Sequence, residues 1–349
     1  MAERSSAAAS RLTVVTLVVS LAAAASTLLP ARAEEPRPEG PHANVRVGLV
    51  FDVGGRGDKS FNDAAYEGLS RAARELGVTT EVLEPSGAED REAAMRLFAA
   101  RGFDLVIGVG FIFSTDVNVV ARDFAGTRFA CIDYAPPMEG AMPPNVAGLR
   151  FREEEGSFLV GAVAGLMSKT GHVGFVGGMD IPLIRKFEAG YRAGVHEVCP
   201  RCEVHAAFAG TTPEAFRDPV KGKALANSEI AAGADIVYHA AGTTGHGVFE
   251  ASRDMGVKAI GVDADQHDEM PGTVLTSMIK RGDVAVFDTI RDVAEGRFQH
   301  GLRTFGLAEG AVGYVDEGPH AAGIPEDTKQ KVEALAQRVI RGEIKIPER

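Results

Sequence analysis

The residues that follow the first apolar strand carry side chains well suited to binding a small molecule. Residues 45–63 read VRVGLVFDVGGRGDKSFND, in which a strand ends at Asp52 and a glycine-rich turn leads into a helix. Ligands of open α/β sheets bind at such a strand end, beside a helix N-terminus. Ser60, Asn62 and Asp63 are candidate caps of that helix. The segment therefore predicts a ligand site that includes Asp52.

A phosphate-binding loop is one alternative for this glycine-rich turn, and the residues around its lysine argue against it. A P-loop places Gly directly before Lys and Ser or Thr directly after it. Here Asp58 precedes Lys59, and a carboxylate at that place would repel a phosphate group. The turn is therefore not interpreted as a nucleotide phosphate site.

Polar groups and glycine also follow several later strands. Asp133, Gly242, Asp263 and Lys280 each come after a short apolar run. An Asp at the end of a strand is usually a turn residue or a helix cap, so each position alone predicts little. Because the carboxyl ends of parallel strands meet at one edge of a sheet, their shared placement predicts a common cleft.

Apolar segments of strand length alternate with helical patterns along the chain. This alternation predicts parallel sheets with helices on both faces. Ten strands are many for a single sheet, so we expect an α/β fold of two similar lobes, with the change near residues 148–155. The expected strands are 45–51, 79–83, 105–109, 128–132, 146–149, 173–176, 203–207, 236–238, 258–261 and 274–277, and the expected helices include 88–100, 157–167, 182–198 and 214–232.

The three cysteines fall into two groups. Cys199 and Cys202 form a C-x-x-C motif after a helical stretch, whereas a thioredoxin-type dithiol begins a helix after a strand. A small structural disulfide is favoured over two thiols in an oxidising compartment. Zinc binding is disfavoured because a second cysteine pair is missing. Cys131 lies in an apolar run and is expected to be a buried thiol.

The first residues have the composition of a secretory signal peptide. Arg4 and Arg11 precede an apolar run over residues 12–29, and Ala31-Arg32-Ala33 offers a cleavage site. Residues 1–33 are therefore expected to be removed, and residues 34–44 to form a flexible leader. Because no lipobox cysteine follows the run, the mature protein is expected to be free in the periplasm. The formal net charge of −11 argues against nucleic acid as a partner.

Five segments together resemble the basic membrane protein family, the substrate-binding proteins of ABC importers that are typified by bacterial purine nucleoside receptors. They are GLVFDVGGRGDKSFND, GFVGGMDIPLIRKFEAGYRAGV, AAGTTGHGVFEA, GVDADQ and LTSMIKRGDVAVFDTI. The resemblance extends from Val45 to Ile346. It implies a type I periplasmic-binding-protein fold, with two α/β lobes that close on the ligand. The chain is expected to cross between lobes near Gly148, Gly272 and Gly301, which gives lobe 1 residues 45–148 and about 274–300 and lobe 2 residues 149–273 and about 301–349.

The resemblance also implies a binding site between the lobes. Phe61 and Phe187 are expected to stack on a purine base from opposite lobes, and Asp263 with Lys280 to bind the ribose as a mutually paired acceptor and donor. Gly242 is expected to bring backbone close to the ligand. The implied ligand-binding residues are Asp52, Phe61, Asn62, Asp133, Phe187, Gly242, Asp263 and Lys280.

The function implied by the resemblance is binding without catalysis, as the periplasmic receptor of an inner-membrane ABC permease. No cofactor or metal is expected, and the protein is expected to be a monomer. Three alternatives remain open at this point: a riboflavin-binding member of the same family, a nucleoside-cleaving enzyme, and a receptor that docks to a membrane sensor. Cleavage would need a poised acid, base or metal beside the sugar, and the sequence offers no clear set.

Overall fold

The computed structural model describes residues 41–87, 90–136 and 140–349. The expected signal peptide and most of the expected leader lie outside the described residues. Residues from Pro38 onward form one compact unit, which contains two sheets. No helix in the described ranges has the length and apolar character that crossing a bilayer requires.

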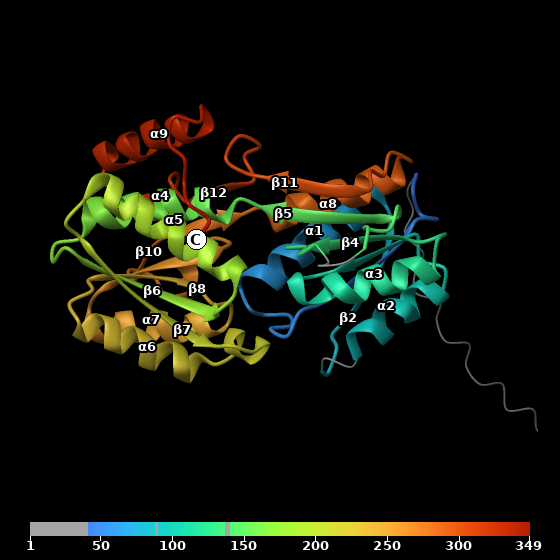
Figure 1. The fold of residues 1–349 in the computed structure, drawn as a ribbon, viewed down its shortest axis with the longest axis horizontal. Coiled ribbons are helices and arrows are strands. Elements are labelled where there is room, and N and C mark those ends of the chain that lie inside the picture. The colour runs from blue at the N-terminus through green and yellow to red at the C-terminus, as the bar shows by residue number, and fades with distance from the viewer. Residues whose placement is uncertain (1–40, 88–89, 137–139) are drawn as a thin grey trace, which may run out of the picture. The chain divides into compact units, whose positions relative to one another are not determined.

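The first sheet has six strands in the order β11-β5-β4-β3-β1-β2, and every neighbouring pair is parallel (Figure 1). Its central strands are apolar on both faces, as expected for strands covered by helices on each side. The strands are β1 (Arg46–Val50), β2 (Thr79–Leu83), β3 (Leu105–Gly108), β4 (Arg128–Ile132), β5 (Val146–Phe151) and β11 (Gly301–Phe305).

The second sheet repeats this arrangement in the order β12-β10-β9-β8-β6-β7. Only β12, at its edge, runs antiparallel to its neighbour. The strands are β6 (His172–Met179), β7 (Glu203–Gly210), β8 (Ile236–Ala240), β9 (Lys258–Asp263), β10 (Val274–Lys280) and β12 (Val312–Tyr314). Position by position the two sheets correspond, so the end of β4 in one matches the end of β9 in the other.

Helices cover both faces of each sheet, which confirms the predicted fold class. Helices α1 and α8 pack together on one face of the first sheet, and α2 and α3 on the other; α4 with α5 and α6 with α7 do the same for the second sheet. They are α1 (Phe61–Leu76), α2 (Asp90–Ala100), α3 (Ser114–Asp123), α4 (Glu153–Met167), α5 (Pro182–Val198), α6 (Pro219–Ala231), α7 (Thr244–Met255), α8 (Gly282–Ala294) and α9 (Glu326–Ile340).

The chain crosses between the sheets later than the glycines suggested, which corrects the expected lobe boundaries. Residues 274–280 pair with β9 in the second sheet, and residues 301–305 pair with β5 in the first. The crossings therefore lie at Arg152, at Arg281 and between β11 and β12. Hydrogen bonds tie them together: Arg152 N–H donates to Phe305 O, and Arg281 N–H to Ala311 O, both at 2.8 Å. Such adjacent crossings suit a hinge.

Helices α4 and α5 approach each other closely through glycines. A Cβ atom built on Gly161 would collide with the carbonyl oxygen of Tyr191, and one on Gly194 with that of Phe158. Only glycine allows backbones to come this near. The contact fixes α5, and with it the side chain of Phe187, relative to the second sheet.

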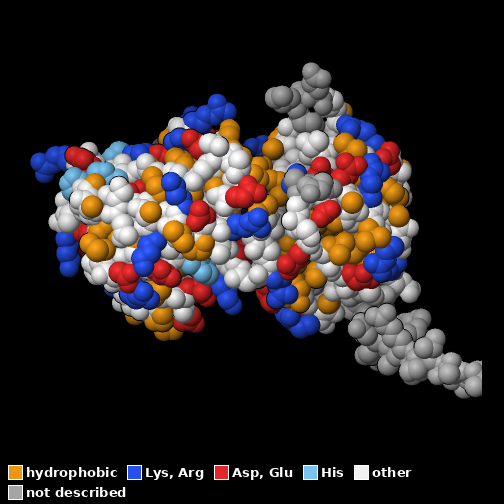
Figure 2. Space-filling view, turned by 90° about the horizontal axis from the view of Figure 1, so that it is seen from below, with side chains coloured by type: hydrophobic (Ala, Val, Ile, Leu, Met, Phe, Trp, Pro, Cys, Tyr) orange, Lys and Arg blue, Asp and Glu red, His pale blue; other side chains and the backbone are white. Residues whose placement is uncertain are grey.

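The surface agrees with the acidic composition. Lys and Arg side chains intermingle with Asp and Glu over the face drawn in Figure 2, and no basic patch gathers there. A nucleic-acid partner would need a basic patch or stripe. This face gives no support to such a partner.

Candidate functional site

All eight residues expected to bind the ligand line one cavity between the carboxyl ends of the two sheets. With its mouth the cavity encloses about 600 Å³, but the centre of a water-sized sphere can occupy only about 60 Å³ of it, so the opposing side chains nearly meet. The first sheet's side contributes Asp52, Phe61, Asn62 and Asp133, and the second contributes Phe187, Gly242, Asp263 and Lys280.

The glycine-rich turn is organised by Asp58. Its carboxylate accepts hydrogen bonds from the backbone N–H groups of Ser60, Asn62 and Asp63 at 2.9–3.1 Å, and from the Asn62 side chain at 3.0 Å. The side chain of Ser60 makes no cap hydrogen bond. In the sequence, Asp58 served only to argue against a phosphate site. In the structure its carboxylate accepts the hydrogen bonds of N–H groups that have no partner within the helix at the start of α1.

Asn62 and Asp52 are hydrogen-bonded to each other on the first lobe's side of the cavity. The Asn62 side-chain oxygen accepts a hydrogen bond from the Asp52 N–H at 3.1 Å, and the Asp52 carboxylate accepts one from the Val53 N–H. Gly110 passes directly over that carboxylate with φ +106°, where a Cβ atom would press on Asp52 Oδ2. Burial raises the pKa of Asp52 to about 7.

This raised pKa predicts the pH dependence of an Asp52→Asn variant. The folded protein holds its proton on Asp52 up to about pH 7, whereas an unfolded chain releases it near pH 4. Ionisation of Asp52 therefore costs the wild type stability as pH rises through this window, and Asn removes that cost. A pKa raised from 3.8 to about 7 corresponds to roughly 4 kcal/mol at pH 8, so we expect Asp52→Asn to raise the melting temperature there by roughly 8 °C or more and to leave it unchanged at pH 4.

Scanning calorimetry of both proteins across this pH range measures the effect. Asp180→Asn is the matched control, because Asp180 is exposed and its hydrogen bonds from Arg185 lower its pKa. Stabilisation of both variants alike, or none for Asp52→Asn at pH 8, would contradict the assigned pKa.

Two carboxylates are presented from matching ends of the two sheets. Asp133 follows β4 with φ +58°, and Asp263 ends β9 with φ +66°. Among the described residues other than glycine, only these two and Lys59 have positive φ. Asp adopts this left-handed conformation more readily than most residues, but at a cost, and such strain gathers at functional sites.

Lys280, at the end of β10, pairs with the first of these carboxylates, and this pairing differs from the expected one. Its ammonium group donates a hydrogen bond to Asp133 Oδ2 at 2.7 Å and lies 3.7 Å from Glu153 Oε1. Asp263 instead accepts a hydrogen bond from the Ser60 hydroxyl at 2.7 Å. The expected Asp263–Lys280 pair is therefore wrong as a direct contact, because the shorter approach is across the cleft to Asp133.

The charges around Lys280 explain how it stays ionised while buried. Burial alone lowers the pKa of Lys280, but the carboxylates of Asp133, Glu153 and Asp263 raise it above its usual value. Burial raises the pKa of Asp133 to about 6, against the lowering effect of Lys280. Asp133 Oδ1 has no hydrogen-bond partner among the described residues, although it is buried. It is therefore available to a ligand donor.

Aromatic rings surround the same lysine. Its Nζ lies 4.8 Å from the centre of the Phe61 ring, 5.3 Å from that of Phe151 and 5.6 Å from that of Phe187. Phe111, two residues after the third expected strand, and Phe216 also line the cavity. Neither was predicted, although the position of Phe111 just after a strand was a usable signal.

Glu153 and Lys186 extend the buried charge network and were also missed. Lys186 Nζ donates to Glu153 Oε2 at 2.6 Å and to the carbonyl oxygen of Phe151 at 2.7 Å. Glu153 begins α4 directly after the first crossing and is 1% exposed. The network therefore connects the cleft with the hinge. The burial of Glu153 could not be predicted from the run EEEG, because acidic runs of this kind usually form the solvent-exposed first turn of a helix.

The cysteines behave as expected. Cys199 and Cys202 are joined by a disulfide at the end of α5, and Cys131 is a buried thiol whose pKa burial raises. Neither group lies among the residues that line the cleft.

The arrangement suits an uncharged ligand with a flat apolar surface and several polar hydrogens. The cleft offers aromatic faces, four carboxyl groups and one ammonium group, so an anion would meet net repulsion. Carboxylates accept hydrogen bonds from N–H and O–H groups.

Comparisons with known proteins agree with this geometry. Residues 45–349 match the Bmp family model, described as ABC transporter substrate-binding protein PnrA-like. A CD4+ T-cell-stimulating antigen of Listeria monocytogenes is 34% identical over 87% of this chain and 88% of its own, and basic membrane protein A of Borreliella afzelii is 31% identical over 86% and 91%. A solved ABC solute-binding protein of Aeropyrum pernix K1 superposes with a TM-score of 0.78 at 33% identity, covering 87% of this chain and 94% of its own. The chain therefore belongs to the basic membrane protein family of PnrA-like ABC transporter substrate-binding proteins.

Proposed function

We propose that this protein binds a purine nucleoside in the cleft between its lobes and delivers it to an ABC permease in the inner membrane. The observation that carries the proposal is the placement of Phe61 on α1 and Phe187 on α5, helices that pack on different sheets, against one cavity that also holds carboxyl groups from both lobes. A base stacked between two rings gains roughly 1–3 kcal/mol for each stacking contact.

The polar groups divide into two sets that match the two parts of a nucleoside. Asp52 follows β1 and is hydrogen-bonded to Asn62 at the start of α1, so the two lie where they can read the N–H and acceptor edge of the base. Asp133, Asp263 and Lys280 lie at the ends of β4, β9 and β10, where they offer acceptors and a donor to ribose hydroxyls. The unpartnered Asp133 Oδ1 supports this division.

The excess of carboxyl groups argues for a nucleoside over a nucleotide. A phosphate group would have to sit beside Asp52, Asp58, Asp133 and Asp263 with a single lysine already bound to Asp133. Its desolvation would go uncompensated. Selection against phosphate esters follows from this balance.

Entry of a nucleoside requires the lobes to separate. The narrow free space and the direct hydrogen bonds Lys280–Asp133 and Ser60–Asp263, which join the two sides, leave no room for a base in this arrangement. Rotation about the three adjacent crossings would open the cleft, and closure on ligand would signal occupancy to the permease. We propose that the protein acts outside the inner membrane as a monomer and performs no catalysis.

Thermal-shift measurements with adenosine, guanosine, inosine, cytidine, riboflavin and ribose test the proposal. A ligand that binds only the folded state stabilises it by RT ln(1 + L/Kd), where L is the free ligand concentration, and so raises the melting temperature. We expect the purine nucleosides to give the largest shifts and adenosine 5′-monophosphate a much smaller one than adenosine. A shift with riboflavin alone would establish the alternative ligand, and shifts with no purine nucleoside would refute the proposal. Inosine should be recovered intact after long incubation; release of hypoxanthine would show an enzyme.

A further inference from the structure

Three metal-ligating side chains meet at the opposite end of the second sheet from the cleft. His172 begins β6, and Glu203 and His205 lie at the start of β7. His172 Nδ1 lies 3.2 Å from His205 Nε2 and 3.6 Å from Glu203 Oε2, and the three ligand atoms all fall within 4.8 Å of one another. The cleft contains none of them.

Strand pairing places all three on the same face. β6 and β7 run parallel, with His172 opposite Glu203 and Gly174 opposite His205. Because side chains alternate between faces, residues two apart on β7 point the same way, and so does the residue paired with the first of them. The sheet therefore delivers two ligands from one strand and a third from its neighbour.

Two of the three separations between ligand atoms match a single small ion. Zinc binds imidazole nitrogen and carboxylate oxygen at about 2.0–2.1 Å in tetrahedral geometry, which separates two ligand atoms by about 3.3 Å. The separations of His172 Nδ1 from His205 Nε2 and from Glu203 Oε2, 3.2 and 3.6 Å, bracket this value. The Glu203 and His205 ligand atoms lie within 4.8 Å of each other, so an ion would draw the exposed Glu203 carboxylate closer. Imidazole ligands favour zinc, copper or nickel over calcium or magnesium.

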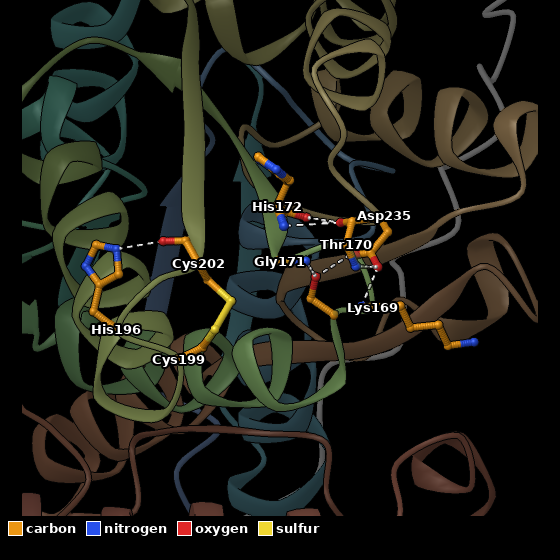
Figure 3. Close-up of a disulfide and its surroundings, with 9 residues drawn as sticks. Lys169, Thr170, Gly171, His172, His196, Cys199, Cys202 and Asp235 are labelled. Atoms are coloured by element: carbon orange, nitrogen blue, oxygen red, sulfur yellow. Dashed lines mark hydrogen bonds between the residues drawn. A yellow bond between two sulfur atoms is a disulfide. The ribbon is translucent and has the colours of Figure 1, made fainter.

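The neighbouring segments hold the ligands in position before any ion binds. Figure 3 shows the disulfide and, beside it, the loop that leads into His172. The Asp235 carboxylate accepts hydrogen bonds from the N–H groups of Lys169 and Thr170, and the Asp235 N–H donates to His172 O. Cys202 directly precedes Glu203, whose N–H donates to Gly171 O at 2.8 Å. Such support limits the ordering cost of binding.

The site is also accessible. The side chain of His172 is 34% exposed and that of Glu203 is 68% exposed. An ion can reach the ligands from solvent, and a water molecule can complete the coordination. A buried structural zinc site would instead have four protein ligands.

We propose that His172, Glu203 and His205 form a binding site for one divalent transition-metal ion of the zinc class, with solvent at the open position. The ion ties the edge strand β7 to β6. This site is independent of nucleoside binding, because it lies at the amino ends of the strands and the cleft lies at their carboxyl ends.

Zinc titration of the full mature chain without a polyhistidine tag tests this site. Competition with a chromogenic chelator gives stoichiometry and affinity, and Co²⁺ substitution gives the visible absorption of a low-coordinate site. We expect one ion per chain. Because loss of an outer-shell partner alone costs roughly 10–100-fold in metal affinity, His172→Ala and His205→Ala should each cost at least about 100-fold. Glu203→Gln should weaken binding by roughly 10-fold or more on the same basis.

Three variants separate the zinc site from other histidines, from loss of folding and from the nucleoside cleft. His300→Ala removes an exposed histidine of the first sheet's side and should leave zinc affinity unchanged. Glu203 is exposed, so Glu203→Gln tests the site even where a histidine variant unfolds. Phe187→Ala should retain zinc binding whether or not it binds nucleoside. Absence of saturable zinc binding in the wild type, or equal affinity in the wild type and the Glu203 and His205 variants, overturns the proposal.

Discussion

Replacing Lys280 by methionine should lower the free energy of unfolding by about 3–5 kcal/mol at pH 8, because removal of one partner leaves buried carboxylates without their counter-charge. Lys280 is 3% exposed and holds Asp133 at 2.7 Å, with Glu153 at 3.7 Å. Methionine keeps the length and apolar stem but cannot neutralise either group. Urea denaturation measures the loss, and nucleoside affinity should fall with it.

The pH dependence of the stability of Lys280→Met shows whether an unpaired Asp133 carboxylate causes the loss. Without Lys280, the pKa of Asp133 should rise further above its value of about 6 in the wild type, so the variant recovers stability as pH falls toward 5 and Asp133 is protonated. The double variant Lys280→Met with Asp133→Asn should likewise recover part of the loss at pH 8.

Lys223→Met is the matched control for this substitution. Lys223 also contacts two carboxylates, Glu250 and Asp254, but on the surface, where such pairs contribute about 0–1 kcal/mol. Equal destabilisation by the buried and the exposed substitution would show that the network around Lys280 contributes little.

Replacing Phe187 by alanine should weaken nucleoside binding by about 1–3 kcal/mol, or roughly 5- to 150-fold, through loss of one stacking surface. Phe187 projects from α5 into the cleft and is 3% exposed. Truncation also costs stability, so Phe187→Leu is the necessary second variant: it keeps most of the apolar volume but lacks a flat face. Isothermal titration with the best nucleoside should rank wild type above Leu and Leu above Ala.

Phe249→Ala separates binding from stability. Phe249 lies on α7, is 1% exposed and does not line the cleft. Its truncation should lower the melting temperature while leaving nucleoside affinity unchanged. If Phe187→Ala retains wild-type affinity, or if Phe249→Ala loses as much, Phe187 is not a stacking residue.

Local patterns predicted most of the secondary structure, and the family resemblance predicted eight of the residues that line the cleft but not Phe111 or Phe216. The strands at 79–83 and 128–132 and the helix at 182–198 have the expected bounds, because continuous apolar runs and a helical period carry their own signal. Strand order then brings Asp52 and Asp133 to the carboxyl edge of the first sheet and Lys280 to that of the second, on opposite sides of one cleft. That these residues bind a nucleoside stays a prediction.

The edge strands β11 and β12 were missed because their stability comes from a neighbour. β11 pairs with β5 and alternates between partly buried and exposed residues, and β12 has only three residues. The crossings lie later than expected for a related reason, because β5 continues beside β11 as far as Phe151 and β10 pairs with β9 in the second sheet before the chain crosses at Arg281.

The sequence by itself determined the fold class, the family and, through the family resemblance, eight of the residues that line the cleft, because these depend on periodicity and on motifs within short segments. Only the tertiary structure decided which charges pair: Lys280 with Asp133 across the cleft rather than with Asp263, and Glu153 with Lys186 at the hinge. It alone also brought His172 and His205 together from positions 33 residues apart. Such contacts follow from strand register and helix packing, which place atoms within a few ångströms of one another and leave no local signal in the chain.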